Sequence, residues 1–232
     1  MSYVSLVNLR DVGGLALTTG GTTRPGVLLR SDAPYDGDAD LATGPLVVWP
    51  PTRVVDLRDE GEAAAGLYSW PTGVARISNP LFTQARVDRA LEDLSLSDLY
   101  ANLLREAPAR ITSALNNFDA EGTTLVHCAA GKDRTGVTVA VALLLSEADP
   151  EAIADDYART ADAIAMVRER MIANGRITTD IAVGHQLLGS PREAIGVVVD
   201  TVSTAPGGVW GWFADNGGDV AHLEAFVARL RG

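Results

Sequence analysis

The sequence is poor in cysteine and in lysine, with one residue of each among its 232 residues. The single cysteine, Cys128, excludes an intramolecular disulfide and a zinc site built from several cysteines. The single lysine, Lys132, stands four residues later, and every other basic residue is an arginine. A chain that otherwise uses arginine therefore keeps its lysine beside its cysteine, which directs attention to this one segment.

Long hydrophobic runs are also absent. The most apolar stretch, Val137 to Leu145, is about half as long as the ~20 residues that a membrane helix needs. The N-terminal residues show no basic start followed by an apolar stretch, so no signal peptide is visible. We therefore expect no stable membrane insertion and a cytoplasmic location, although export without a signal is compatible with the sequence.

Positive charge is scarce, because 19 basic residues face 30 acidic ones and give a net charge of −11 at pH 7. This balance argues against binding to nucleic acid and against long-range attraction to an anionic membrane. If the protein acts on phosphates, it must gather positive potential in one local pocket. The bias toward arginine and alanine indicates a GC-rich bacterial genome, and the length and 47% hydrophobic content predict one domain over residues 1–232.

Short β-branched runs alternate with helical patterns along the first 145 residues. Four such runs are expected to form strands, over residues 27–30, 53–57, 74–77 and 123–127. Helices are expected from a cap at Ser97, after a break at Pro108 over residues 109–118, and over residues 137–145. This alternation predicts an α/β fold with a mainly parallel central sheet flanked by helices.

Residues 150–205 are too long for a simple connection and predict a helical insertion that could act as a lid. Asp149-Pro150-Glu151 is typical of a helix start, and the helix is expected to reach Asn174, with Gly175 as its left-handed end. A last amphipathic helix is expected over residues 219–230.

The segment His127-Cys-Ala-Ala-Gly-Lys-Asp-Arg-Thr-Gly136 lies between an expected strand and an expected helix. A loop of this length can turn successive backbone N–H groups inward as an anion nest, and the helix N-terminus adds positive potential. Arg134 can hold two phosphate oxygens with its planar guanidinium, and the same field favours the thiolate of Cys128. Attack by this thiolate on a phosphate monoester would give a phosphocysteine that water hydrolyses.

The remaining residues of the segment have supporting roles in this interpretation. Gly131 allows backbone angles that other residues avoid, and Thr135 can donate its hydroxyl to the departing thiolate. His127 is expected to orient the loop rather than to bind a metal, and the chemistry requires no cofactor. The other positions expected to surround the phosphate are Ala129, Ala130, Lys132 and Gly136.

The pattern Cys-x5-Arg followed by threonine resembles the phosphate loop of the protein tyrosine phosphatase superfamily. Six fixed positions would match by chance at a frequency on the order of 10⁻⁸ per start. The loop is most similar to a bacterial branch typified by the mycobacterial tyrosine phosphatase B type. Further similarity to that branch lies in residues 8–14, 24–26, 29–31, 55–58 and 153–157.

The resemblance implies activity on phosphoproteins and on phosphoinositides, with Lys132 favouring the extra phosphates of an inositol ring. It implies Asp133 and Asp56 as the acidic partners, and Arg58 as a residue that could face the site. Many tyrosine phosphatases carry their general acid in a Trp-Pro-Asp loop, and this tripeptide is absent. We rank Asp133 first as the acid and Asp56 second; Asp98 is third, because it has a simpler interpretation as a helix cap.

Two other functions are compatible with parts of the pattern. One is a phosphate-binding pseudophosphatase, and the other is a rhodanese-like sulfurtransferase, whose loop also surrounds an anion. The presence of Cys128, Arg134 and Thr135 at phosphatase spacing favours hydrolysis of a phosphate monoester. The substrate would be a phosphorylated protein or a phosphoinositide, while the oligomeric state cannot be inferred from the sequence.

Overall fold

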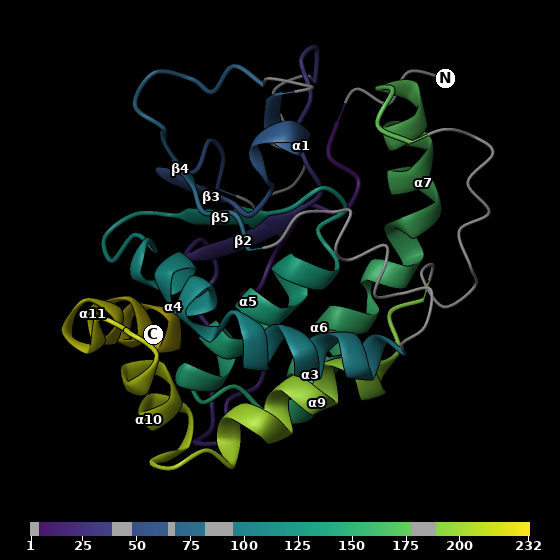
Figure 1. Ribbon diagram of the computed structural model, residues 1–232. Coiled ribbons are helices and arrows are strands. Elements are labelled where there is room, and N and C mark those ends of the chain that lie inside the picture. Colours follow the sequence, from purple (N-terminus) through teal and green to yellow (C-terminus); the bar gives the residue numbers. More distant parts are fainter. Residues whose placement is uncertain (1–4, 39–47, 65–67, 82–94, 178–188) are drawn as a thin grey trace.

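The computed structural model describes residues 5–38, 48–64, 68–81, 95–177 and 189–232 (Figure 1). Its centre is a five-stranded sheet with the strand order β1-β2-β5-β3-β4. The strands are β1 (Arg10–Asp11), β2 (Leu28–Ser31), β3 (Arg53–Asp56), β4 (Ala75–Ser78) and β5 (Thr124–His127). Only β1 pairs antiparallel, with β2, so the mainly parallel sheet is confirmed.

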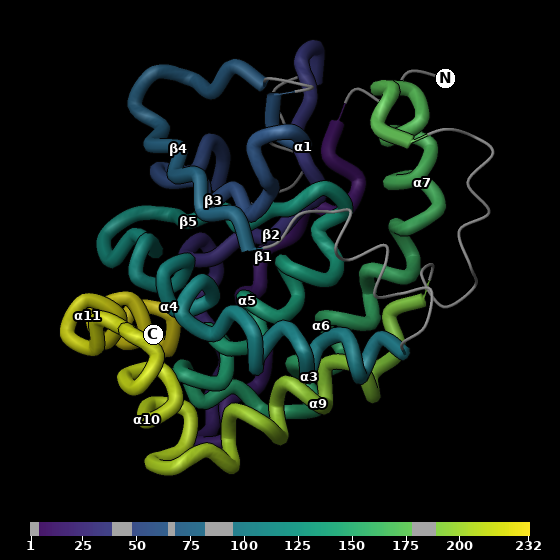
Figure 2. Tube along the Cα trace, viewed as in Figure 1, coloured from purple at the N-terminus to yellow at the C-terminus, as the bar shows by residue number. Residues whose placement is uncertain are grey.

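Helices cover this sheet, most of them on one face (Figures 1 and 2). That layer contains α3 (Leu96–Glu106), α4 (Pro108–Asn116), α5 (Asp133–Leu145), α6 (Pro150–Ala158), α9 (Arg192–Ser203), α10 (Gly208–Asp215) and α11 (Val220–Arg231). The short helix α1 (Glu60–Ala64) lies on the other side of the sheet, and α7 (Thr160–Ala173) stands at one end. The α/β fold with flanking helices is therefore confirmed.

The core is centred on α5, whose residues from Arg134 to Leu145 are all buried. Helix α9 packs against α3, α5 and α6, so part of the expected insertion belongs to the core. On the opposite face of the sheet a smaller cluster covers the strands; its members are Leu29, Val54 and Leu125, with Leu9, Trp49, Trp70 and Val74 packed against them. The sheet is thus sandwiched between unequal layers.

All four predicted strands form within one residue of their expected bounds, but the cap of α3 was predicted wrongly. Ser95, not Ser97, precedes the helix, and its hydroxyl accepts from the Asp98 backbone N–H while the Asp98 carboxylate accepts from the Ser95 backbone. This reciprocal capping box satisfies two N–H groups at once, which a cap at Ser97 would not. Asp98 is therefore a capping residue at the outer end of α3.

The single helix predicted from Pro150 to Asn174 is also wrong, because α6 and α7 meet at Arg159. The break lies where Arg10 binds both the Asp156 carboxylate (2.7 Å) and the Thr160 hydroxyl (3.1 Å). This contact comes from the other end of the chain, so local spacing cannot reveal it. The predicted cap at Asp149 and the left-handed stop at Gly175, with φ +66°, are confirmed.

The expected lid includes residues 178–188, which lie outside the described residues. The preceding helix, α7, is joined to the loop after β2 by Arg170, a side chain with only 1% of its area exposed. Its Nε donates to Asp32 at 2.9 Å, and its two Nη atoms donate to Asp38 at 2.9 Å. Helix α7 is therefore held by a buried ion pair beside the sheet.

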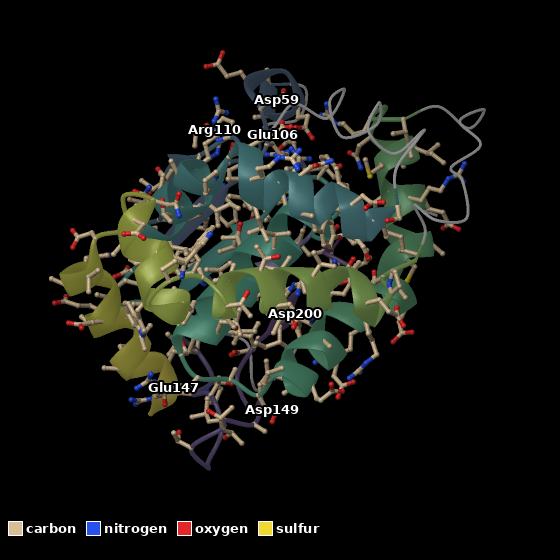
Figure 3. The ribbon with its side chains drawn as sticks, turned by 60° about the horizontal axis from the view of Figure 1, so that its bottom comes forward. Asp59, Glu106, Arg110, Glu147, Asp149 and Asp200 are labelled. Carbon is tan, nitrogen blue, oxygen red and sulfur yellow. The ribbon has the colours of Figure 1, made fainter. Side chains whose placement is uncertain are left out.

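Figure 3 turns the helical layer toward the reader. Asp200 on α9 lies on its outer surface, and Glu147 and Asp149 mark the turn between α5 and α6. No helix in the described part of the chain combines the length and the apolar character needed to cross a membrane.

Candidate active site

The Cys128 loop begins where three parallel strands end together. In the sheet, His127 of β5 lies between Ser31 of β2 and Asp56 of β3. Cys128 follows directly, and α5 starts at Asp133, four residues earlier than the predicted start at Val137. The loop therefore connects the end of the central strand to the start of a buried helix, which is the usual place for a ligand in such sheets.

Three successive carbonyl groups of the loop are tied to other parts of the protein. The Ala129 carbonyl accepts from the Ala33 backbone N–H (3.0 Å), and the Ala130 carbonyl accepts from the Asn8 amide (3.0 Å). The Gly131 carbonyl accepts from Arg30 Nη2 (3.0 Å) and from Asn8 (3.3 Å). Because a trans peptide places N–H opposite C=O, the N–H groups that follow these carbonyls point the other way. These contacts fix the orientation of three successive peptide groups, which supports the predicted anion nest.

Gly131 is required at its position for two reasons. Its φ of +69° lies in the left-handed region, and a Cβ there would be 2.3 Å from the Ser31 carbonyl oxygen. The tight approach of the loop to the end of β2 therefore depends on the missing side chain.

Arg134 occupies the second position of α5 and is almost fully buried. Its two Nη atoms donate to the two carboxylate oxygens of Glu62, at 2.6 and 2.7 Å. Burial alone would lower the pKa of Arg134, but the bond to Glu62 and the nearby Cys128 outweigh it, so the pKa is raised and the guanidinium stays charged. The orientation of this cation is therefore set by a bidentate carboxylate.

Glu62 is a functional candidate that the sequence analysis missed. The Glu62 carboxylate also accepts from the Asp59 backbone N–H (3.0 Å), while the Asp59 carboxylate accepts from the Glu62 backbone N–H (2.9 Å). The two residues thus form a capping box at the start of α1, which fixes the carboxylate that faces Arg134. The spacing Asp59-x-x-Glu62 after a strand was the signal that could have identified it.

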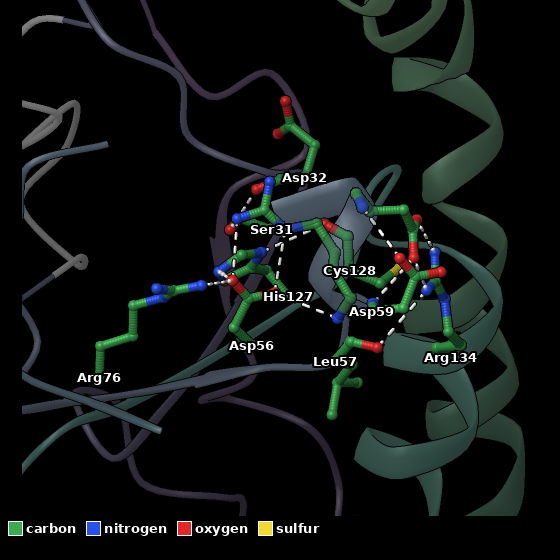
Figure 4. Close-up of polar contacts among 11 residues, drawn as sticks. Ser31, Asp32, Asp56, Leu57, Asp59, Arg76, His127, Cys128 and Arg134 are labelled. Carbon is green, nitrogen blue, oxygen red and sulfur yellow. Dashed lines mark hydrogen bonds and ion pairs between the residues drawn. The ribbon is translucent and has the colours of Figure 1, made fainter. Parts of the chain in front are cut away.

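Asp56 and Arg58 form a second ion-paired cluster. In Figure 4, Asp56 lies on the opposite side of Leu57 from Arg134. The Asp56 carboxylate accepts hydrogen bonds from Nε and Nη2 of Arg58 (2.9 and 2.8 Å) and from Nη2 of Arg76 (2.9 Å). Burial by itself raises the pKa of Asp56, yet the adjoining His127 and the two arginines hold it well below its ordinary range. Among the described residues, neither Asp56 nor Arg58 is hydrogen-bonded or ion-paired to Arg134 or Cys128.

His127 lies between the two clusters and is completely buried. Its Nδ1 is 3.2 Å from the Cys128 carbonyl, which can only accept, so Nδ1 carries the proton. Its Nε2 lies 3.8 Å from Asp56, too far for a hydrogen bond. Burial, reinforced by the charge of Arg58, lowers the pKa of His127 to about 4 despite the attraction of Asp56, so the ring is neutral at pH 7.

The two charged residues between Gly131 and Arg134 contact each other. Lys132 is buried; its ammonium donates to the Gly189 carbonyl (3.0 Å) and lies 3.5 Å from Asp133 Oδ1. Asp133 is partly exposed and accepts a hydrogen bond from Tyr100 at 2.6 Å. Lys132 thus connects the loop to the segment before α9 instead of extending into solvent.

Two groups at the base of the loop complete the arrangement. Cys128 is buried, with 3% of its area exposed, as expected for a thiol beneath an anion site. The Thr135 hydroxyl is buried and has no hydrogen-bond partner among the described residues, so it can donate to an incoming group. The described residues contain no cluster of three His, Cys, Asp or Glu side chains suited to a metal ion.

Buried arginines support the loop from behind, and the sequence analysis gave them no role. Asp156 on α6 accepts from Arg10 (2.7 Å) and from Arg30 (2.6 Å), and Arg30 in turn holds the Gly131 carbonyl. Burial would raise the pKa of Asp156, but the two arginines outweigh it and lower the pKa. Arg30, which holds the Gly131 carbonyl, is therefore itself fixed by an acid on α6.

Comparison with known proteins agrees with this geometry. The family model described as "Tyrosine phosphatase family" matches residues 1–232. The "triple specificity protein phosphatase PtpB" of Mycobacterium tuberculosis is 31% identical over 120 residues, which cover 47% of this chain but only 42% of that protein. A Cupriavidus necator protein, provisionally named a tyrosine-protein phosphatase, is 26% identical over 244 residues, covering 100% of this chain and 87% of its own length. The chain belongs to the tyrosine phosphatase family.

Proposed function

We propose that the protein hydrolyses phosphate monoesters through a phosphocysteine formed on Cys128. The observation that carries this proposal is that three successive loop carbonyls, directly after the buried Cys128, are each held by another part of the protein. A dianion entering the loop would meet the opposed N–H groups, the N-terminus of α5 and the guanidinium of Arg134. Thr135 would donate its hydroxyl to the sulfur when the thiolate leaves.

Asp133 is our candidate for the general acid. Its side chain is partly exposed at the first position of α5, whereas the carboxylate of Asp56 is committed to two arginines and stays ionised. A general acid must reach the departing oxygen of the substrate. The partly exposed Asp133 can do this, whereas Asp56, with 0% of its area exposed, cannot. Asp133 would protonate the departing phenol or alcohol oxygen, and Asp56 would hold Arg58 and the end of β3.

Phosphotyrosine is the proposed principal substrate, with phosphoserine, phosphothreonine and phosphoinositides as further candidates. The name of the mycobacterial relative, a triple specificity protein phosphatase, supports a broad range. For the protein to act on a phosphoinositide, Lys132 would also have to release its hydrogen bond to the Gly189 carbonyl and bind a second phosphate group of the substrate. Phosphoinositides are therefore the most demanding part of this range.

The covalent mechanism is tested with Cys128→Ser and Arg134→Ala, assayed on phosphotyrosine, phosphoserine and a phosphoinositide. We expect Cys128→Ser to lose turnover on all substrates and to keep its affinity for inorganic phosphate, because the nest and Arg134 remain. Arg134→Ala should lose both. Turnover above about 1% in Cys128→Ser would contradict the proposal, since ~10²-fold is under 3 kcal/mol, too little for a lost nucleophile. Sulfur transfer from thiosulfate by the native protein would instead indicate a sulfurtransferase.

A further inference from the structure

Two buried tyrosines reach the loop from different helices. Tyr100 on α3 and Tyr157 on α6 have 0% and 1% of their areas exposed, and their rings meet edge to face at 6.1 Å. Their hydroxyl oxygens are 2.6 Å apart, and the Tyr100 oxygen is also 2.6 Å from Asp133 Oδ1. Two phenols and the proposed general acid thus form one short chain of hydrogen bonds.

The direction of the protons in this chain follows from counting donors. A phenol has one proton, and the carboxylate oxygen must receive one, so Tyr100 donates to Asp133. Tyr157 must then donate to the Tyr100 oxygen. Burial and the nearby Asp133 raise the pKa of both tyrosines, so both stay protonated at neutral pH and keep this direction. Aligned hydrogen bonds of this kind polarise and strengthen one another.

The chain leaves the two oxygens of Asp133 in different surroundings. Oδ1 faces the Tyr100 hydroxyl and the Lys132 ammonium, 3.5 Å away, which are both donors. Among the described residues, Oδ2 has no hydrogen bond. An oxygen that faces two donors cannot itself carry a proton toward them, so a neutral Asp133 holds its proton on Oδ2.

We propose that Tyr100, supported by Tyr157, is a positioning residue that directs the Oδ2 proton of Asp133 at the leaving group. This inference rests on the proposed function, because it takes Asp133 as the acid. As the S–P bond forms and the P–O bond breaks, the Oδ2 proton passes to the leaving oxygen. The resulting carboxylate keeps the Tyr100 bond and later takes a proton from the water that attacks phosphorus and releases the thiolate.

Tyr100 therefore has a measurable effect on the first chemical step. It fixes the acid, and in that step the acid matters only for substrates whose leaving group needs a proton. Removing the hydroxyl should thus slow formation of the phosphocysteine from phosphotyrosine and spare a substrate whose leaving group departs without a proton.

The test compares Tyr100→Phe with the native protein on phosphotyrosine and on nitrophenyl phosphate, whose leaving group departs without a proton. We expect kcat/KM, which reports the steps up to departure of the leaving group, to fall about tenfold on phosphotyrosine and to change less than about twofold on nitrophenyl phosphate. Tyr157→Phe should show the same pattern more weakly. Tyr68→Phe, at a ring that packs edge to face against Trp70, should show none.

Asp133→Asn separates the failure of this inference from the failure of the proposed acid. If Asp133→Asn is selective for phosphotyrosine but Tyr100→Phe slows both substrates equally or slows neither, the tyrosine inference is wrong and the acid stands. If Asp133→Asn slows both substrates equally, the proposed acid is wrong and the inference falls with it. If the proposed acid and the tyrosine inference are both right, adding Tyr100→Phe to Asp133→Asn should not lower the rate on phosphotyrosine any further, because the tyrosine acts through the carboxyl group of Asp133.

Discussion

At the scale of single residues, three buried arginines near the loop are paired with acids. Glu62 holds Arg134 and Asp56 holds Arg58 through two nitrogen atoms each, whereas Asp156 holds Arg30 through one. A guanidinium bound on two atoms by a carboxylate has a defined plane, and a buried cation without an acidic partner would be costly. These pairs therefore set the direction of the positive groups while reducing the cost of burying them.

The Glu62 pair leads to a specific prediction. Glu62→Gln keeps the size of the side chain but removes its charge, so Arg134 should lose its defined plane. We expect kcat/KM on phosphotyrosine to fall by about 10- to 100-fold, which corresponds to the weakening of one bidentate charged contact. Glu60→Gln, an exposed position on the same short helix, is the matched control and should leave the rate unchanged. Tighter binding of inorganic phosphate by Glu62→Gln would mean that Glu62 competes with the substrate instead.

His127 gives a prediction for the dependence of stability on pH. The folded protein holds its pKa at about 4, below the ordinary value of 6.5. Between these values the unfolded chain binds a proton that the folded protein excludes, so stability should fall as the pH drops from about 6.5 to about 4. The loss attributable to this ring is on the order of 3 kcal/mol.

The measurement is the free energy of unfolding in urea at several pH values, for the native protein and for His127→Gln. The difference between the two should shrink steadily as the pH falls through this window. Burial, opposed by the attraction of Arg170, raises the pKa of Asp32 to about 6. Protonation of Asp32 therefore changes stability in the opposite direction as the pH falls. This contribution is the same in both proteins and cancels in their difference. A constant difference for His127→Gln would contradict the prediction.

At the scale of elements, the start of α5 is pressed against α6. Gly136 lies where a Cβ would be 2.9 Å from the Tyr157 ring, whereas Gly196 in α9 has open space at the same point. The absence of a side chain at Gly136 therefore lets α6 approach closely enough for Tyr157 to reach Tyr100. The helix contact and the hydrogen-bond chain depend on the same glycine.

Two alanine substitutions test this packing. Gly136→Ala should destabilise the protein by about 1–3 kcal/mol, because the added methyl group overlaps a buried ring. Gly196→Ala is the matched control, and it should stabilise the protein by up to about 1 kcal/mol through its better helix propensity. Thermal or urea unfolding measures both changes. Equal effects from the two substitutions would show that helix propensity, not the contact with Tyr157, decides the outcome.

At the scale of the whole molecule, an acidic protein concentrates its buried positive charge at one place. The buried basic side chains of the described residues are Arg10, Arg30, Arg58, Lys132, Arg134 and Arg170. They belong to the loop, to the residues that hold it or to the segments beside it, whereas acids such as Asp200 lie on the outer surface of the helical layer. The net charge of −11 therefore says little about the potential that a substrate meets inside the site.

The sequence alone determined the strands, the parallel α/β architecture and the candidate nucleophile. Each of these depends on local spacing: β-branched runs for the strands, their alternation with helices for the sheet, and Cys128 six positions before Arg134 for the loop. Local chemistry also predicted the cap at Asp149 and the stop at Gly175. It failed at Ser97 and at Arg159, where a competing capping box and a contact from Arg10 decided the boundary.

Only the tertiary structure decided what surrounds each acid. Asp56 and Asp133 were both candidates for the proton donor, and the sequence could not show that two arginines surround one of them while Tyr100 meets the other. Glu62 and Asp156 reach their arginines from 72 and 126 residues away in the sequence. The state of an ionisable group depends on burial and on neighbouring charges, and a folded chain brings those neighbours from distant segments.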